Sequence, residues 1–381
     1  MKNIIPVVLA ADENYSMPMS VTMVSILANA KETTFIDFFL LVPSQFSKQF
    51  VEKINSLKDK YPNCNIHFID MKDRFNNVRI DISHTTFTTY YRLLAANLLP
   101  QYDKCIYLDA DTVVCGDLSD LFNTSISIYY IAGVKAPLFH YPKGGRNPHC
   151  KKIGLPSIDQ YINAGILLMN LKKMRDDGII EKFLLLIENN YPTQDQDVLN
   201  VACYNHIKHL HFKYNIMTKY KLSNVFLNGF DKRVTNIFRV NEIEEAINNP
   251  QIIHYVDKVK PWNDISCYMS KYWWNYARFS PFYSDILKQN IEIILQNYFF
   301  NNISNDEIVY ILKDFNEIKK KLKIQNDQIK QLYNSYSFKL GNAITYLPRK
   351  MLMFFNCWEK HGLLYAIKRS AQELKRFFPI S

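Results

Sequence analysis

Short apolar runs alternate with helix-like stretches over residues 4–134, and this alternation constrains the fold more than any other feature of the chain. Apolar runs of strand length cover 4–11, 37–42, 66–69, 105–108 and 131–134, and helical patterns cover 16–30, 44–61 and 86–99. Strand and helix units in succession build a parallel sheet with helices on both faces. We therefore predict an α/β fold with a mostly parallel sheet.

The rest of the chain continues this pattern less regularly. Strands are predicted at 163–170 and 252–256, and helices from the first of these to about residue 190 and over 195–204. The segment 137–156 is rich in Pro, Gly, His and Lys, so we expect a flexible loop over the functional site. The globular part is expected to occupy residues 1–280 and a helical region residues 281–381.

All of the excess positive charge lies near the C-terminal end. The chain carries +10 at pH 7, and residues 319–381 hold 13 Lys and Arg against 3 acids, so residues 1–318 have no net charge. Apolar residues at helical spacing lie between the basic ones, which predicts a basic amphipathic extension that binds an anionic membrane surface. The alternative is packing on its own domain or against another copy. No nucleic-acid partner is expected, because no binding module of that kind is recognisable.

The chain carries no pattern of export or of a membrane span. The first apolar run meets Asp12 and Glu13 without a cleavage site, and no apolar run approaches the roughly 20 residues that a bilayer requires. The 7 cysteines are scattered without a C-x-x-C pair, which argues against a disulfide framework and a zinc site. We expect a cytoplasmic protein, bound peripherally to the inner face of the cytoplasmic membrane.

The apolar run at 105–108 ends in two acids, Asp109 and Asp111. Side chains alternate along an extended strand, so both acids would project to one side and share a divalent cation at the edge where open α/β sheets bind ligands. The plainer interpretation is that aspartates follow strands because they suit turns. The chain has neither G-x-G-x-x-G nor a Walker pattern, so phosphate would be held by a metal ion and lysine.

A family resemblance is carried by six strings in order: Ala10-Ala11-Asp12-Glu13-Asn14-Tyr15, Thr88-Thr89-Tyr90-Tyr91-Arg92-Leu93, Leu108-Asp109-Ala110-Asp111, Asn163-Ala164-Gly165, Gln194-Asp195-Gln196-Asp197, and His254-Tyr255 with Lys260-Pro261-Trp262. Over about residues 3–275 the chain resembles the family 8 glycosyltransferases, especially the bacterial lipooligosaccharide galactosyltransferases and glucosyltransferases. The resemblance implies a Rossmann-like nucleotide-sugar-binding domain of the GT-A type at residues 1–280, followed by the helical basic C-terminal extension.

The resemblance also implies a ligand set and residue roles. Asp109, Asp111 and His254 correspond to the ligands of Mn²⁺ or Mg²⁺, and this mixture of oxygen and nitrogen ligands suits manganese. Residues implied to bind the UDP-hexose donor are Asp12 and Asn14 at the uridine, Arg92, Asp109 and Ala110 beside the donor, Asn163, Asp195 and Gln196 around the transferred sugar, and Lys260 at the diphosphate. Gln196 and Asp195 are the candidate catalytic residues, because they would orient hydroxyls and offer an oxygen near the anomeric carbon.

Plainer roles exist for several of these residues. His254 could be a hydrogen-bonded core residue, Arg92 a surface ion pair, and 194–197 a helix N-terminus whose acids face the dipole, which is the role expected of Asp197. Two positions depart from the family pattern: Asp257 stands where relatives usually have glycine, and Lys135 where an acid is common. We expect a different donor-sugar or acceptor preference from these departures.

The implied activity is retaining, metal-dependent transfer of galactose or glucose from a UDP-sugar to a saccharide acceptor, with a glycolipid such as the lipopolysaccharide core as the expected acceptor. One alternative is a glycogenin-like, self-glucosylating protein, which needs a tyrosine that reaches a neighbouring active site. Another is a non-catalytic sugar-binding scaffold, which predicts eroded metal ligands. A covalent intermediate and attack by the acceptor on the same face are both open, because the amide of Gln196 is a poor nucleophile.

Overall fold

The structure is a computed structural model that describes residues 3–44, 46–72, 74–75, 87–140, 147–220, 231–256 and 258–302. By its contacts the chain separates into two compact units, Met1–Asn297 and Tyr298–Ser381. The last helix of the described part, α13 (Tyr283–Asn302), begins beyond the expected boundary at residue 280 and starts in the first unit. The basic extension, Asp257 and residues 141–146 of the expected loop lie outside the described residues, so the interpretations placed on them stay predictions.

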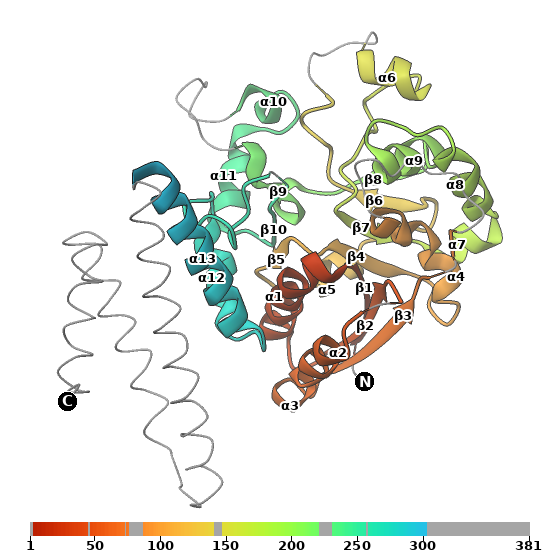
Figure 1. Ribbon diagram of the computed structural model, residues 1–381. Helices are drawn as coiled ribbons and strands as arrows, with labels where there is room; N and C mark the ends of the chain where they lie inside the picture. Colours follow the sequence, from red (N-terminus) through yellow and green to blue (C-terminus); the bar gives the residue numbers. More distant parts are fainter. Residues whose placement is uncertain are drawn as a thin grey trace, which may run out of the picture. The chain divides into compact units, whose positions relative to one another are not determined.

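A seven-stranded sheet forms the centre of the first unit, with the strand order β3-β2-β1-β4-β7-β6-β8 (Figure 1). Strands β3, β2, β1 and β4 pair in parallel, β7 is antiparallel to β4 and β6, and β8 is parallel to β6. The strands are β1 (Asn3–Ala10), β2 (Thr34–Val42), β3 (Cys64–Asp70), β4 (Cys105–Asp109), β6 (Ile131–Gly133), β7 (Ile166–Met169) and β8 (Ile207–His209). The predicted α/β fold with a mostly parallel sheet is confirmed.

A second, smaller sheet has the order β5-β10-β9. It consists of β5 (Thr112–Val114), β10 (Ile252–His254) and β9 (Ile216–Met217). Strand β10 runs antiparallel to β5, with His254 opposite Thr112. Because β5 starts only three residues after the end of β4, this pairing carries His254 to the carboxyl edge of the main sheet.

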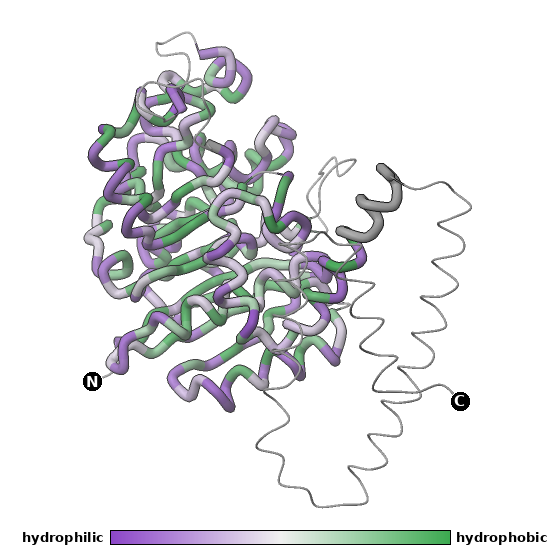
Figure 2. The backbone as a smooth tube through the Cα atoms, turned by 90° about the vertical axis from the view of Figure 1, so that its left-hand side faces the viewer, coloured by the Kyte–Doolittle hydropathy of each residue, from purple (hydrophilic) through white to green (hydrophobic). Residues whose placement is uncertain are grey.

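Helices cover both faces of the main sheet because its strands are apolar on both faces. Alternate residues of β1 enter different clusters: Val7 and Leu9 pack with α1 (Glu13–Asn29), α2 (Lys48–Asn55) and α12 (Ser270–Ala277), whereas Val8 packs with the other helical layer. That layer contains η1 (Phe87–Leu94), α4 (Ala95–Leu98), α7 (Leu171–Asp176), α8 (Ile179–Ile187) and α9 (Gln194–Ala202). In Figure 2 the hydrophobic colour follows the central strands, and the surrounding helices are mixed.

Short elements complete the described part of the chain. They are α3 (Leu57–Lys60), α5 (Ser119–Phe122), α6 (Pro148–Ile153), η2 (Phe212–Tyr214), η3 (Thr218–Tyr220), α10 (Lys232–Thr235) and α11 (Val240–Asn248). None of the helices described is long and apolar enough to cross a bilayer.

Three local expectations were wrong. The helix expected over 44–61 begins only after Ser47 and is divided into α2 and α3, and the one expected over 86–99 starts as a 3₁₀ helix. The segment 137–156, expected to be a loop, contains α6, since Asn147 caps its first turn and Pro148 occupies the first helical position, where proline costs no hydrogen bond.

Candidate active site

The two acids of the D-x-D string lie on either side of a tight turn between the two sheets. Asp109 is the last residue of β4, and Asp111 precedes β5, so the expectation that both extend from one strand was wrong. The hydroxyl Oγ1 of Thr22 in α1 lies 3.0 Å from the carbonyl oxygen of Ala110 and 2.7 Å from that of Thr112, which holds the turn against the helix. The turn, rather than the alternation of a strand, aims both carboxylates at one point.

His254 meets these carboxylates from the small sheet. Its Nε2 atom lies 3.5 Å from Oδ2 of Asp109 and 3.3 Å from Oδ1 of Asp111, and one ligand atom of each residue lies within 4.8 Å of the others. The side chain is buried, but it faces two acids and not the apolar core. Two carboxylate oxygens and one imidazole nitrogen at this spacing suit a divalent metal ion with positions left for other ligands.

Gly165 provides the room for this cluster. A Cβ atom on Gly165 would lie 2.1 Å from Cε1 of His254 and 2.7 Å from Oδ2 of Asp109. Real Cβ atoms do not approach other atoms so closely, so the residue at this position must lack a side chain. The glycine of the string Asn163-Ala164-Gly165 is therefore explained by the close approach of two metal-binding candidates.

Lys260 supplies a buried positive charge beside Asp111. Its Nζ atom lies 2.6 Å from Oδ2 of Asp111 and also donates to the carbonyl oxygen of Tyr255. Burial alone would lower the pKa of Lys260, but the attraction of Asp111 raises it, so the ammonium stays charged. Burial likewise opposes ionisation of Asp111, but the adjacent His254 and Lys260 hold its pKa well below the usual range.

Arg92 joins the metal cluster to the residues expected around the sugar. It is buried, so the surface ion pair considered for it is excluded. Its Nη2 atom lies 2.9 Å from Oδ1 of Asp109, its Nε atom 2.9 Å from Oδ2 of Asp195, and its Nη1 donates to the carbonyl oxygen of Ala164 at 2.7 Å. The guanidinium carbon lies 4.3 Å from the centre of the Tyr107 ring, a cation–π distance.

Asp195 is a second buried acid, held by Arg92 and by Thr89, whose hydroxyl donates to Oδ1 at 2.7 Å. Burial raises the pKa of Asp195 to about 6, and the positive charge of Arg92 opposes that shift. Nε of Arg92 donates to the carbonyl oxygen of Thr89, and Oδ2 of Asp195 has no hydrogen bond within the part of the chain that the structure describes. A buried acceptor without a donor, next to a cation, is a candidate contact for a ligand hydroxyl.

The amide of Gln196 is clamped at both ends. Its Oε1 accepts from Nδ2 of Asn163 at 3.0 Å and from the backbone N–H of Ala164 at 3.1 Å, and its Nε2 donates to the hydroxyl of Tyr161 at 3.1 Å. Tyr161 donates in turn to Oδ1 of Asp197. Asp197 accepts from the backbone N–H of Thr193 at 2.8 Å, in agreement with the helix-start role expected for it.

Asn215 is a buried residue of this cluster that the sequence strings do not contain. Its Nδ2 donates to Oδ1 of Asn163 at 2.8 Å, and its Oδ1 lies 3.1 Å from Nδ1 of His254. Tyr161 was missed as well. Neither residue carries a local signal, because an asparagine before a two-residue strand and a single tyrosine among polar and apolar neighbours are ordinary.

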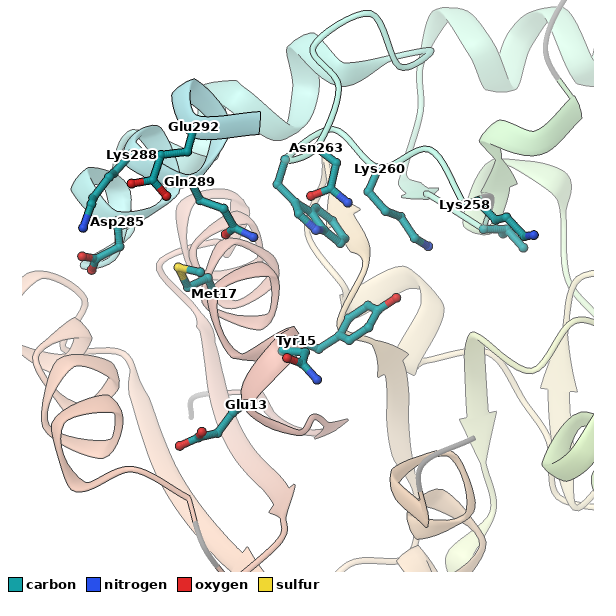
Figure 3. A pocket seen from close by; sticks show the side chains of 13 residues that line it. Glu13, Tyr15, Met17, Lys258, Lys260, Asn263, Asp285, Lys288, Gln289 and Glu292 are labelled. Atoms are coloured by element: carbon teal, nitrogen blue, oxygen red, sulfur yellow. The ribbon is translucent and has the colours of Figure 1, made fainter. Parts of the chain in front are cut away.

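A pocket of about 830 Å³ opens beside Lys260 and falls in the size range of ligand sites (Figure 3). Asn14 and Tyr15 line it from the start of α1, Trp262 from the segment after β10, and Gln289 from α13. Asp12 lies two residues after β1, where its carboxylate accepts from the backbone N–H groups of Asn14 and Tyr15 and caps α1. The candidates around the sugar, Asn163, Asp195 and Gln196, do not line this pocket. Arg92 links Asp195 to Asp109 of the metal cluster, whereas Lys260 contacts the cluster at Asp111.

The fold and the cluster together define a class of protein. A mostly parallel α/β sheet with charged side chains and a pocket at its carboxyl edge is the arrangement in which open α/β proteins bind their ligands.

Comparison with known proteins specifies the class further. The model of glycosyl transferase family 8 matches residues 6–266. The chain is 26% identical over 271 residues to General stress protein A of Bacillus subtilis, covering 68% of this chain and 88% of that protein. It is 27% identical over 281 residues to a lipopolysaccharide 1,2-glucosyltransferase of Escherichia coli, covering 71% and 77%.

Two solved structures share the fold. The bifunctional glycosyltransferase WbbM superimposes with a TM-score of 0.67 at 22% identity, over 76% of this chain and 52% of that one. The galactosyltransferase LgtC, solved with donor and acceptor sugar analogs, gives a TM-score of 0.57 at 24% identity, over 71% and 95%. The chain belongs to glycosyl transferase family 8: it is a glycosyltransferase with a GT-A fold, as the strings predicted.

Proposed function

We propose that this enzyme transfers galactose or glucose from a UDP-sugar to a saccharide acceptor, with retention at the anomeric carbon and with Mn²⁺ or Mg²⁺ bound. The observation that carries the proposal is the convergence of Asp109, Asp111 and His254 next to the ammonium of Lys260. The departing diphosphate is strongly anionic, so the reaction needs concentrated positive charge at the place where that group leaves. Intact ligands also argue against a non-catalytic scaffold.

The metal ligands and Lys260 serve the leaving group. When bound by Asp109, Asp111 and His254, a divalent cation acts as a Lewis acid toward the diphosphate oxygens. Lys260 contributes a second positive charge that stays ionised beside Asp111. Asn14, which lines the pocket with Lys260, contacts the nucleoside, and Asp12 holds the start of α1 in place for that contact.

The residues around the sugar orient it without bonding to it covalently. Both lone pairs of Oε1 of Gln196 are already engaged, by Asn163 and by the backbone of Ala164. The remaining hydrogen on its Nε2 is what the amide offers to the donor sugar. This arrangement favours attack by the acceptor on the same face over a covalent intermediate at Gln196. Oδ2 of Asp195, which is paired with Arg92 but accepts no hydrogen bond within the described residues, would accept a sugar hydroxyl.

The test is turnover of purified protein with Mn²⁺ and a panel of UDP-hexoses, with and without a saccharide acceptor, measured as UDP release. Asp111→Ala is expected to lose almost all turnover, because it removes one ligand and the partner of Lys260. Asp176→Ala, which removes an exposed acid paired with Lys172, is the matched control and should retain full turnover. More than a tenth of wild-type turnover in Asp111→Ala would contradict the metal assignment.

The acceptor is proposed to be a glycolipid of the lipopolysaccharide type, on two grounds. One is the similarity to the Escherichia coli lipopolysaccharide glucosyltransferase, and the other is the charge of residues 319–381. A basic amphipathic extension would hold the cytoplasmic enzyme at the inner membrane face, where such acceptors lie. Deleting residues 319–381 should abolish cosedimentation with anionic liposomes and preserve UDP-sugar hydrolysis. Unchanged cosedimentation would reject the membrane proposal.

A further inference from the structure

Three amide side chains form a continuous chain of hydrogen bonds between the sugar side of the site and the metal side. Gln196 is bonded to Asn163, Asn163 to Asn215, and Asn215 to His254. The two asparagines and the histidine come from separate parts of the chain, and Asn215 and His254 are fully or almost fully buried. Water therefore has little access with which to compete for the bonds at the histidine end.

The direction of every bond in this chain is set by two backbone N–H groups. A backbone N–H can only donate. That of Gly165 donates to Oδ1 of Asn163 at 3.1 Å, and that of Ala164 donates to Oε1 of Gln196 at 3.1 Å. Both contacts identify the amide oxygens without ambiguity, so Nδ2 of Asn163 must be the atom that faces Gln196.

The same argument determines which nitrogen of the His254 imidazole carries the hydrogen. Because Oδ1 of Asn163 is an acceptor, the Asn215 atom 2.8 Å from it must be the donor Nδ2. The other end of the Asn215 amide, its oxygen, then faces Nδ1 of His254 at 3.1 Å. An oxygen in this position requires a hydrogen on Nδ1, which leaves the lone pair of the neutral ring on Nε2, between Asp109 and Asp111.

We propose that Asn215 is a positioning residue that holds His254 in the tautomer able to bind the divalent metal ion. The proposal rests on the proposed function, since it assumes that His254 is a ligand. In the opposite tautomer, Nε2 would carry a hydrogen and donate it to the two carboxylates, which would occupy the metal position with a hydrogen bond. Partners of this kind behind a metal-bound histidine commonly contribute about 10–100-fold to metal affinity.

Two variants separate the donor and acceptor functions of Asn215. Asn215→Ala removes both. Asn215→Asp keeps an oxygen that accepts from Nδ1 of His254 but loses the Nδ2 donor to Asn163. We expect Mn²⁺ affinity, measured in the presence of UDP by loss of the free Mn²⁺ EPR signal, to fall roughly 10–100-fold in Asn215→Ala and to stay within about threefold of wild type in Asn215→Asp.

The tautomer itself is read in the metal-free wild-type protein by long-range ¹H–¹⁵N NMR of ¹⁵N-histidine, with His254→Gln used to assign the signal. The spectrum is recorded with the ring neutral: a sole ring hydrogen on Nδ1 supports the proposal, and a sole ring hydrogen on Nε2 overturns it, even if Asn215→Ala fails to fold. Wild-type Mn²⁺ affinity in folded Asn215→Ala, or equal loss in both variants, also overturns it. Failure of the proposed function is separate: it is a wild-type enzyme without UDP-sugar turnover, whatever the tautomer.

Discussion

Gly165 and His254 lie so close together that a Cβ atom on the glycine would come within 2.1 Å of Cε1 of the imidazole. The glycine belongs to the segment before β7 in the main sheet, and the histidine ends β10 in the small sheet. The two sheets therefore meet at the metal cluster, and the space between them is sized for a backbone without a side chain.

Gly165→Ala should weaken Mn²⁺ binding at least about tenfold, because the added methyl group must displace His254 or Asp109 from the cluster. The measurement is Mn²⁺ affinity by calorimetry in the presence of UDP. Gly116→Ala is the matched control: a Cβ there would meet Oε1 of Gln251 at 2.4 Å, but that atom ends a side chain that can turn away. Equal affinities in the two variants would contradict this account of Gly165.

Replacing Arg92 should cost stability as well as turnover. The residue is buried and lies 2.9 Å from both Asp109 and Asp195, so Arg92→Ala leaves two acids without their cation and should lower the free energy of unfolding by about 3–5 kcal/mol. Arg92→Lys should lose less, because one ammonium can pair with one of the acids but cannot span both.

Urea unfolding at pH 7 in the absence of metal measures these losses. The control is the exposed Arg278→Lys, expected within about 0.5 kcal/mol of wild type. Stability of Arg92→Ala close to that of this control would show that the buried ion pairs are compensated elsewhere.

Asp195 should make folding less favourable as pH rises through the weakly acidic range. Burial raises its pKa from 3.8 to about 6 despite Arg92, so the folded chain binds the proton more tightly than the unfolded chain. The contribution of Asp195 to the free energy of unfolding is therefore fully present below pH 3.8 and is lost as the pH rises to about 6. At roughly 1.4 kcal/mol per pKa unit, the loss is about 3 kcal/mol.

The measurement is the difference in unfolding free energy between wild type and Asp195→Asn, both without metal, from pH 4 to pH 7. The asparagine does not titrate, so the wild type should become progressively less stable relative to the variant over this range. Two curves that run parallel would mean that Asp195 has an ordinary pKa in the folded protein.

Tyr161→Phe should reduce kcat and have little effect on the KM of the UDP-sugar. The hydroxyl accepts from Nε2 of Gln196 and donates to Asp197, so its loss frees the amide end that the proposed function assigns to the donor sugar. One such bond is worth about 1 kcal/mol, which corresponds to a reduction of roughly fivefold. Tyr102→Phe removes a comparable tyrosine–aspartate bond, to Asp37, and is the control. A rise in KM with unchanged kcat would place the effect of Tyr161 in binding instead.

The local pattern of apolar residues was sufficient to predict the central strands and the first helix of this protein. The apolar runs of β1, β2, β3 and β4 and the helical segment of α1 follow from side-chain periodicity, because burial on a strand or a helix repeats within a few residues. The same pattern could not reveal that β7 runs antiparallel or that α6 forms within 137–156. The direction of a strand depends on the path of the connection before it, which is longer than the few residues over which the apolar pattern repeats. The formation of a short helix such as α6 depends on a single capping residue.

The six strings were sufficient to predict the family and to name the candidate metal ligands, since Asp109, Asp111 and His254 do converge. Their spacing along a strand was the wrong reason, however: the convergence depends on a turn between two sheets and on the pairing of β10 with β5. Tertiary structure alone decided three other features of the site. They are the position of Arg92 between two acids, the close approach of Gly165 to the imidazole, and the hydrogen bonds of Asn215 and Tyr161. Each of these features joins residues that are distant in the chain, and each depends on where individual polar atoms point and how deeply they are buried. A single sequence records the residue types but not the directions of their polar atoms.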